Sequence, residues 1–226
     1  MKKIYSIYGS GGFAREVMPL LKSLYEGENI QKNFLFIDDF SNQCEINGSK
    51  VFSIENLIKE FPDHEIYCNI AIADAKIRKR VSESCEKFGF NLLTIKALNS
   101  VLLENVIIGS GSVLCPFTTI TSNVKIGNSF HANLYSYVGH DCSIGDFVTF
   151  APGVKCNGNV TISNNVYVGT GAIILPGTYD KPIIIGENSK IAAGAVVTKS
   201  VPDNVTVIGN PAQILTKSLL RKLKSN

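Results

Sequence analysis

The sequence lacks any hydrophobic run that approaches the roughly 18 consecutive apolar residues of a membrane-spanning helix. Its first residues, Met-Lys-Lys-Ile-Tyr, lack the apolar segment and the cleavage site of a signal peptide. Neither positive nor negative charge dominates, because 22 basic and 19 acidic side chains leave a net charge of only +3 over 226 residues. We therefore expect a cytoplasmic protein with no membrane partner and no nucleic-acid partner.

The sequence also lacks the cysteine spacings of metal sites and disulfide frameworks. Its six cysteines form no CxxC pair and no closely spaced group. In a reducing compartment, isolated cysteines pack as small apolar side chains. We therefore predict neither a metal ion nor disulfide bonds.

Two local clusters of positive charge stand out from this even background. The usual interpretation of such a cluster is the solvated face of a helix. The first cluster is also a candidate for binding a phosphate group. The first comprises Lys76, Arg78, Lys79 and Arg80, and the second comprises Lys217, Arg221, Lys222 and Lys224.

The first half of the chain alternates strand-like and helix-like segments, which is typical of βαβ units on a parallel sheet. An apolar content of 45% is sufficient for a sizeable core. We predict a Rossmann-like domain over residues 1–98. The predicted strands are 3–8, 34–37, 66–72 and 91–95, and the predicted helices are 14–25, 54–60 and 77–88.

From about residue 100 an apolar residue recurs at every sixth position. The series continues without exception to Ile174, is interrupted after Thr178, and resumes at Ile185, Ile191 and Val197. The interruption predicts an inserted loop. The uninterrupted series is Leu102, Ile108, Leu114, Ile120, Ile126, Ala132, Val138, Ile144, Phe150, Cys156, Ile162, Val168 and Ile174.

A period of six fits neither an α-helix nor a simple alternating strand, but it fits a β-helix with three six-residue faces per turn. Glycine often follows the periodic residue, as at Gly109 and Gly139, and a small or β-branched residue often lies four positions after it, as at Ser112 and Val148. Both features suit tight corners around a narrow core. We predict a β-helix over residues 99–215 and a basic tail over 216–226.

The repeated pattern [Ile/Val/Leu]-Gly-x-x-[small]-x resembles that of the left-handed β-helix, hexapeptide-repeat acyltransferases. The stretches 191–198 and 207–212 also resemble the end of such domains. With the α/β domain in front, the whole chain resembles the NeuD and PglD type of sugar acetyltransferase. The resemblance implies an acetyl-CoA-dependent homotrimer that acetylates a nucleotide-linked amino sugar for bacterial surface glycans such as the lipopolysaccharide O-antigen.

The stretch 137–146 matches the family segment that carries the catalytic histidine, which the resemblance assigns to His140. Acetyl transfer requires a base because only a neutral nucleophile adds productively to a thioester, and imidazole titrates near neutral pH. The resemblance makes Asp141 the carboxylate partner of His140, although a simple turn residue is the alternative. We interpret His64 as a surface residue and His131 as structural.

The resemblance places acetyl-CoA in the groove between neighbouring β-helices. Gly158 lies eighteen residues, or one full turn, after His140, so it should stack beside the base. Its amide could then donate to the thioester oxygen, and a simple corner glycine is the competing interpretation. The predicted acetyl-CoA contacts are Asn133, Thr149, Ala151, Gly158, Thr170 and Ala193.

The sequence Tyr8-Gly-Ser-Gly-Gly-Phe-Ala14 is a glycine-rich turn between a strand and a helix, suited to the approach of a diphosphate. The resemblance assigns the surrounding pocket to a nucleotide sugar. Several family members carry histidine where this chain has Phe13, so a polar contact differs here. The predicted sugar-nucleotide contacts are Gly9, Ser10, Gly11, Gly12, Phe13, Asp38, Asp39, Ala73, Asp74 and Arg78.

On this resemblance, we predict acetylation of the 4-amino group of a UDP- or dTDP-linked 4-amino-4,6-dideoxy sugar by direct attack, with His140 as general base. Within the same class, O-acetylation of sialic acid or a related sugar is the alternative. Two further alternatives belong to other classes: a zinc hydratase of the β-helix type and a binding module that senses nucleotide sugars. The spacing of His131 and His140, half a turn, disfavours a zinc site.

Overall fold

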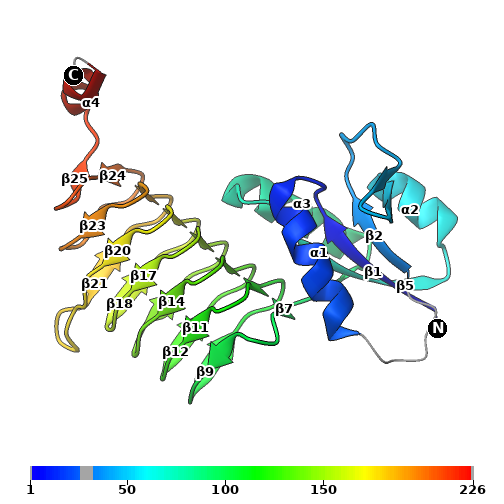
Figure 1. Ribbon diagram of the computed structural model, residues 1–226, viewed down its shortest axis with the longest axis horizontal. Coiled ribbons are helices and arrows are strands. Elements are labelled where there is room, and N and C mark those ends of the chain that lie inside the picture. The colour runs from blue at the N-terminus through cyan, green and yellow to red at the C-terminus, as the bar shows by residue number, and fades with distance from the viewer. Residues whose placement is uncertain (1, 26–32, 225–226) are drawn as a thin grey trace.

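The computed structural model describes residues 2–25 and 33–224. It consists of an N-terminal α/β domain packed against one end of a long column of short strands (Figure 1). The terminal helix α4 (Lys217–Lys224) lies at the other end of the column. Within the described ranges, no helix is long and apolar enough to cross a membrane.

The N-terminal domain is built on a six-stranded sheet in the order β3-β4-β2-β1-β5-β6. All neighbouring strands are parallel except β3 and β4. This arrangement confirms the predicted Rossmann-like fold. The strands are β1 (Lys2–Tyr8), β2 (Asn33–Ile37), β3 (Glu45–Ile46), β4 (Ser49–Phe52), β5 (His64–Ile70) and β6 (Asn91–Leu92), and the helices are α1 (Gly12–Leu24), α2 (Ile54–Glu60) and α3 (Ala75–Lys87).

Two details of this domain differ from the sequence-based prediction. A hairpin, β3–β4, turns through Asn47 and Gly48, which both have positive φ angles. The Asn-Gly pair is a strong hairpin signal that the prediction missed. The predicted strand 91–95 is two strands, because β6 joins the α/β sheet while β7 (Ile95–Lys96) pairs with the β-helix. The coils therefore start before residue 99.

The C-terminal domain is a left-handed parallel β-helix with three faces, as predicted. Face 1 contains β7, β10 (Val113–Leu114), β13 (His131–Ala132), β16 (Thr149–Phe150), β19 (Tyr167–Val168), β22 (Lys190–Ile191), β24 (Thr206–Ile208) and β25 (Gln213–Ile214). Face 2 contains β8 (Val101–Leu102), β11 (Thr119–Ile120), β14 (Tyr137–Val138), β17 (Lys155–Cys156), β20 (Ile173–Ile174) and β23 (Val196–Val197). Face 3 contains β9 (Val106–Ile108), β12 (Val124–Ile126), β15 (Ser143–Ile144), β18 (Val160–Ile162) and β21 (Ile183–Ile185).

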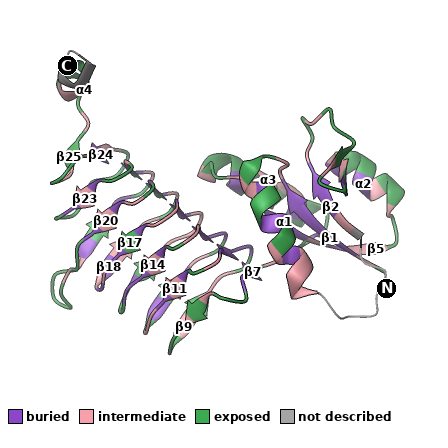
Figure 2. Ribbon diagram, viewed as in Figure 1, coloured by how far each residue is buried: buried purple, intermediate pink, exposed green. Residues whose placement is uncertain are grey.

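The coils stack with residues eighteen positions apart in register, as for His131 and Thr149 or Val138 and Cys156. The periodic apolar residues belong to one continuous core along the column, and Figure 2 shows buried segments on successive coils. Burial of this apolar surface is the main force that stabilises the coils. The inserted loop is present after Ile174, and Tyr179 at its tip is exposed.

The glycines that follow the periodic residues have a different role from the predicted one, which was to form tight corners. The positive-φ corner positions between faces 2 and 3 are mostly asparagine, as at Asn105, Asn123 and Asn159. Asparagine tolerates this left-handed conformation because its short amide bonds locally. The glycines after the periodic residue instead allow the coils to approach, since a Cβ on Gly139 would lie 2.7 Å from the Gly158 nitrogen.

Candidate active site

His140 lies at the corner between β14 and β15, where its side chain is 61% exposed. The Nδ1 atom of His140 lies 2.7 Å from Oδ2 of Asp141. An ionised carboxylate can only accept, so Nδ1–H donates and the tautomer leaves a lone pair on Nε2. Among the described residues, Nε2 has no hydrogen-bond partner, so it can accept a proton.

A ladder of side-chain amides holds Asp141 in place. Asn105 donates to Asn123 over 3.1 Å, and Asn123 donates to Oδ1 of Asp141 over 3.1 Å. These hydrogen bonds stabilise the ionised form, so those from His140 and then Asn123 lower the pKa of Asp141 from its ordinary value. The sequence analysis missed Asn123, although its spacing of eighteen residues from Asp141 is visible in the sequence.

The imidazole of His140 lies directly against Gly158 on the next coil. A Cβ built on Gly158 would lie 2.5 Å from Nε2 of His140, so no larger residue fits without moving the ring. Among the residues that the structure describes, no acceptor bonds the amide of Gly158, whereas its carbonyl accepts from Gly177. The residue that packs against the ring therefore has a backbone amide that is not used within the described structure.

A second group of predicted residues lines a small cavity of about 160 Å³ on face 1 of the β-helix. Predicted acetyl-CoA contacts and predicted sugar contacts meet here. Ala193 lies elsewhere, on the coil that packs against Gly169. The lining residues are Phe13, Ala73, His131, Asn133, Thr149, Phe150, Ala151, Pro152, Tyr167 and Thr170.

The glycine-rich turn lies at the carboxyl end of β1, where parallel sheets commonly bind ligands. Gly9 has a φ of 101°, which favours glycine, and a Cβ on Gly11 or Gly12 would meet nothing within 4 Å. The turn leads into α1, which carries no acidic residue in its first turn and no side-chain cap. Its open N-terminus can receive an anionic group.

The two aspartates at the end of β2 are engaged with the same turn. Asp38 accepts from Ser10, while Asp39 accepts from the phenol of Tyr8 and from the Ile54 amide. Burial and then the hydrogen bond to Asp39 raise the pKa of Tyr8. Both aspartates line a cavity of about 220 Å³ between β2 and the start of α2.

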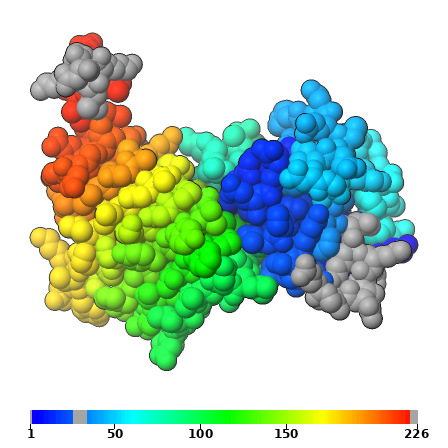
Figure 3. All heavy atoms as spheres, in the orientation of Figure 1, coloured from blue at the N-terminus to red at the C-terminus, as the bar shows by residue number. Residues whose placement is uncertain are grey.

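Arg78 does not lie where the sequence suggested. It is fully buried between the two domains, and its Nη1 donates to the carbonyls of Ile72 and Ala73. Its Nη2 donates to the Phe147 carbonyl and the Thr149 hydroxyl of the β-helix. The structure therefore corrects both expectations: Arg78 is neither on a solvated helix face nor open to a diphosphate, and it joins the domains that Figure 3 shows in contact.

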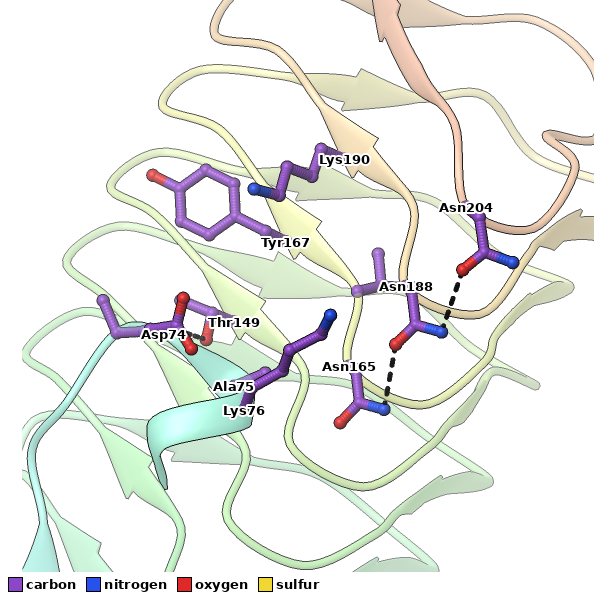
Figure 4. Close-up of a pocket in the computed structure, with 11 residues that line it drawn as sticks. Asp74, Ala75, Lys76, Thr149, Asn165, Tyr167, Asn188, Lys190 and Asn204 are labelled. Atoms are coloured by element: carbon purple, nitrogen blue, oxygen red, sulfur yellow. Dashed lines mark hydrogen bonds between the residues drawn. The ribbon is translucent and has the colours of Figure 1, made fainter. Parts of the chain in front are cut away.

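A larger trough of about 540 Å³ lies beside the small cavity, between the first turn of α3 and face 1. Lys76 from the first basic cluster extends into it from the start of α3, and Tyr167 and Lys190 lie on the strand wall (Figure 4). Asn165 donates to Asn188, which donates to Asn204. The sequence analysis did not single out these wall residues. Of the second basic cluster, the side chains of Lys222 and Lys224 lie outside the described residues.

The predicted catalytic residues and the small cavity thus occupy separate places on one chain. His140, Asp141 and Gly158 lie at the corner between faces 2 and 3, whereas the small cavity lies on face 1. Among the residues described, no group of three or more His, Cys, Asp or Glu side chains could hold a metal ion.

Comparison with known proteins places this geometry in a family. Residues 5–85 match the PglD N-terminal domain. Over 81% of this chain and 83% of its relative, the sequence is 48% identical to the GDP-perosamine N-acetyltransferase of Escherichia coli O157:H7. The chain belongs to the PglD-like family of sugar acetyltransferases.

Solved structures of PglD-like proteins share the whole fold. WeeI from Acinetobacter baumannii AYE superposes with a TM-score of 0.91, covering 95% of this chain and 100% of WeeI at 50% identity. PerB from Caulobacter crescentus, solved in complex with CoA and GDP-perosamine, gives a TM-score of 0.82 at 26% identity, covering 94% of this chain and 97% of PerB. Like the relative that is 48% identical, this PglD-like protein is an acetyltransferase.

Proposed function

We propose that this enzyme transfers the acetyl group of acetyl-CoA to the amino group of a nucleotide-linked 4-amino-4,6-dideoxy sugar, with His140 as general base. The observation that carries the proposal is the His140–Asp141 pair, whose ring packs against Gly158, a residue with an unbonded amide among the described residues. A base and an oxyanion donor side by side are what attack on a thioester requires. The product supplies bacterial surface glycan synthesis in the cytoplasm.

In the proposed reaction the sugar nitrogen forms a bond to the acetyl carbon while the carbon–sulfur bond breaks. His140 Nε2 accepts the proton that the nitrogen loses and returns it to the departing CoA sulfur. Asp141 stabilises the imidazolium, and the Gly158 amide donates to the carbonyl oxygen as negative charge develops. Because the nucleophile attacks directly, no acyl-enzyme forms.

The nucleotide is the point on which the comparisons and the sequence-based expectation differ. The sequence analysis predicts UDP or dTDP, whereas the relative that is 48% identical acts on GDP-perosamine. We propose GDP-perosamine as the first substrate to test. The diphosphate would lie at the glycine turn and the start of α1, and the base and ribose near Asp38 and Asp39.

We further propose that two subunits of a homotrimer complete each site. The groups at the His140 corner and the small cavity lie on different faces of one β-helix, so one chain does not bring them together. A neighbouring copy can place its His140 corner against the cavity and leave a groove for the pantetheine arm. Closed cyclic symmetry repeats this arrangement in every subunit.

Positively charged and aromatic side chains on and beside face 1 support the binding of acetyl-CoA. Lys76 and Lys190 supply positive charge in the trough that adjoins the small cavity, and Tyr167 supplies an aromatic wall there (Figure 4). A phosphate-bearing nucleotide matches these cationic and aromatic walls.

A thiol-release assay with acetyl-CoA and a panel of acceptors tests the function. The panel contains GDP-perosamine, the UDP- and dTDP-linked 4-amino-4,6-dideoxy sugars, and sialic acid. We expect acceptor-dependent release of CoA, highest with GDP-perosamine, together with an acetylated product by mass spectrometry. If CoA is released only with sialic acid, the enzyme is an O-acetyltransferase instead. If no acceptor causes release of CoA, the alternative of a module that only binds nucleotide sugars is favoured.

A further inference from the structure

His131 is buried more completely than a polar side chain without partners normally is. Its exposed fraction is 1%, and neither ring nitrogen makes a hydrogen bond with any described residue. The Ile70 backbone lies near the ring but does not meet hydrogen-bond geometry. A buried polar group without a partner costs free energy, so each case calls for an explanation.

The position of His131 supplies that explanation. It belongs to β13 on face 1 and lines the small cavity together with Phe13 and Thr149. The rings of Phe13 and His131 lie 5.1 Å apart between centroids. Phe13 directly follows the glycine turn, so His131 lies just beyond the proposed diphosphate position, on the side that faces the β-helix.

We propose that His131 is a substrate-positioning residue that hydrogen-bonds the sugar ring of the acceptor in this cavity. The inference rests on the proposed function, because it takes the acceptor to be a nucleotide-linked amino sugar. The ligand supplies hydrogen-bond partners for the two unpaired ring nitrogens of His131. Without the ligand the buried ring has no partner, and this unfavourable free energy is the cost of a preformed polar contact.

The chemistry of the ring fits a sugar better than a phosphate. Burial, and then the positive charge of Arg78, lower the pKa of His131 well below its ordinary value, so the ring is neutral at working pH. A neutral imidazole offers one donor and one acceptor, which matches a sugar hydroxyl. The cavity wall is otherwise mostly apolar, with Phe13, Ala73 and Ala151, and suits the faces of a pyranose ring.

Steady-state kinetics of the His131→Leu and His131→Gln variants test this role, with GDP-perosamine as acceptor and GDP as a competitive inhibitor that lacks the sugar. His131→Leu removes a hydrogen bond to a neutral partner and should raise KM for GDP-perosamine about tenfold, whereas His131→Gln keeps a donor and an acceptor and should raise it less. The KM for acetyl-CoA and the inhibition constant of GDP should stay within twofold. The melting temperature of His131→Leu should be unchanged or higher, because an unpaired buried polar group is removed.

His64→Gln is the matched control, since His64 also has a buried Nδ1 without a partner but lies in the N-terminal domain away from the cavity. It should leave both KM values unchanged. If either His131 variant folds poorly, imidazole NMR of the wild type replaces it, because the chain has only three histidines. The His131 nitrogens should then shift on addition of GDP-perosamine and stay unmoved with GDP.

The outcomes separate this inference from the proposed function. If the wild type acetylates GDP-perosamine but the His131 variants keep its KM within twofold, His131 is structural and the inference is wrong. A selective rise in KM for acetyl-CoA would assign the cavity to the cosubstrate and overturn it as well. If the wild type acetylates no amino sugar, the proposed function has failed first.

Discussion

The imidazole of His140 and the backbone of Gly158 are in direct contact across neighbouring coils. A Cβ on Gly158 would lie 2.5 Å from both Cε1 and Nε2 of the ring and 2.9 Å from Cδ2. The φ angle of Gly158 does not lie in the left-handed region, so its backbone alone does not demand glycine. The space that the ring occupies is the constraint.

Gly158→Ala should therefore impair catalysis without unfolding the enzyme. The new methyl displaces the exposed ring and breaks its alignment with Asp141, so we expect kcat to fall about a hundredfold, the lower end of the range for general-base catalysis. The melting temperature should change little, because the ring can move into solvent. In a His140→Ala background the same change should have little further effect on kcat. Additive losses in the double variant would contradict this account.

Asn123 and Asp141 should affect the base through its orientation. Asp141→Asn should lower kcat by less than His140→Ala does, since an amide can still orient the ring but cannot stabilise an imidazolium. Asn123→Gly removes the hydrogen bond to Asp141, together with the one from Asn105, and should lower kcat about threefold to tenfold. Asn105→Gly is the control, because it lies at the same type of left-handed corner but does not contact Asp141. Equal losses at positions 105 and 123 would indicate a purely structural role.

Much of this arrangement could be predicted because the geometry of a β-helix produces a regular repeat in its sequence. The six-residue period fixed the faces, and the eighteen-residue turn predicted that Gly158 lies beside His140. The contacts of Arg78 and His131 could not be predicted in the same way. Both depend on how the N-terminal domain packs on face 1, which brings together residues about 70 positions apart, such as Arg78 and Thr149. No local periodicity encodes such a contact.

The burial of His131 predicts a specific dependence of stability on pH. Its pKa in the folded state lies well below 6.5, so below about pH 6.5 the unfolded chain binds a proton that the folded chain excludes. The free energy of unfolding should consequently fall as the pH is lowered, from about pH 6.5 down to the lowered pKa, with a slope of up to about 1.4 kcal/mol per pH unit. Arg78 contributes to this effect by repelling the charged ring.

Urea denaturation of wild type and His131→Leu between pH 7.5 and pH 5 measures this contribution, since the difference between the two curves removes the effect of all other groups. The wild type should lose more stability than the variant on acidification. Parallel pH dependences would show that folding does not lower the pKa of His131.

The proposed composite site predicts a homotrimer in solution. Phe117 and Tyr135 form a stacked, exposed pair with ring centroids 4.9 Å apart, and Leu98 on the same edge is 80% exposed. Exposed apolar groups of this kind are typical of interaction surfaces. Light scattering should give three times the chain mass of 24.5 kDa. A fully active monomer at micromolar concentration would exclude a site shared between subunits.

The turnover of His140→Ala tests the central claim most directly. The imidazole removes a proton in the transition state and is not required to hold either substrate, so both KM values should stay nearly unchanged. With saturating acetyl-CoA and GDP-perosamine, kcat should fall between about a hundredfold and ten-thousandfold. A variant that keeps more than about a tenth of wild-type turnover would contradict the account, because that loss lies far below the range for a general base.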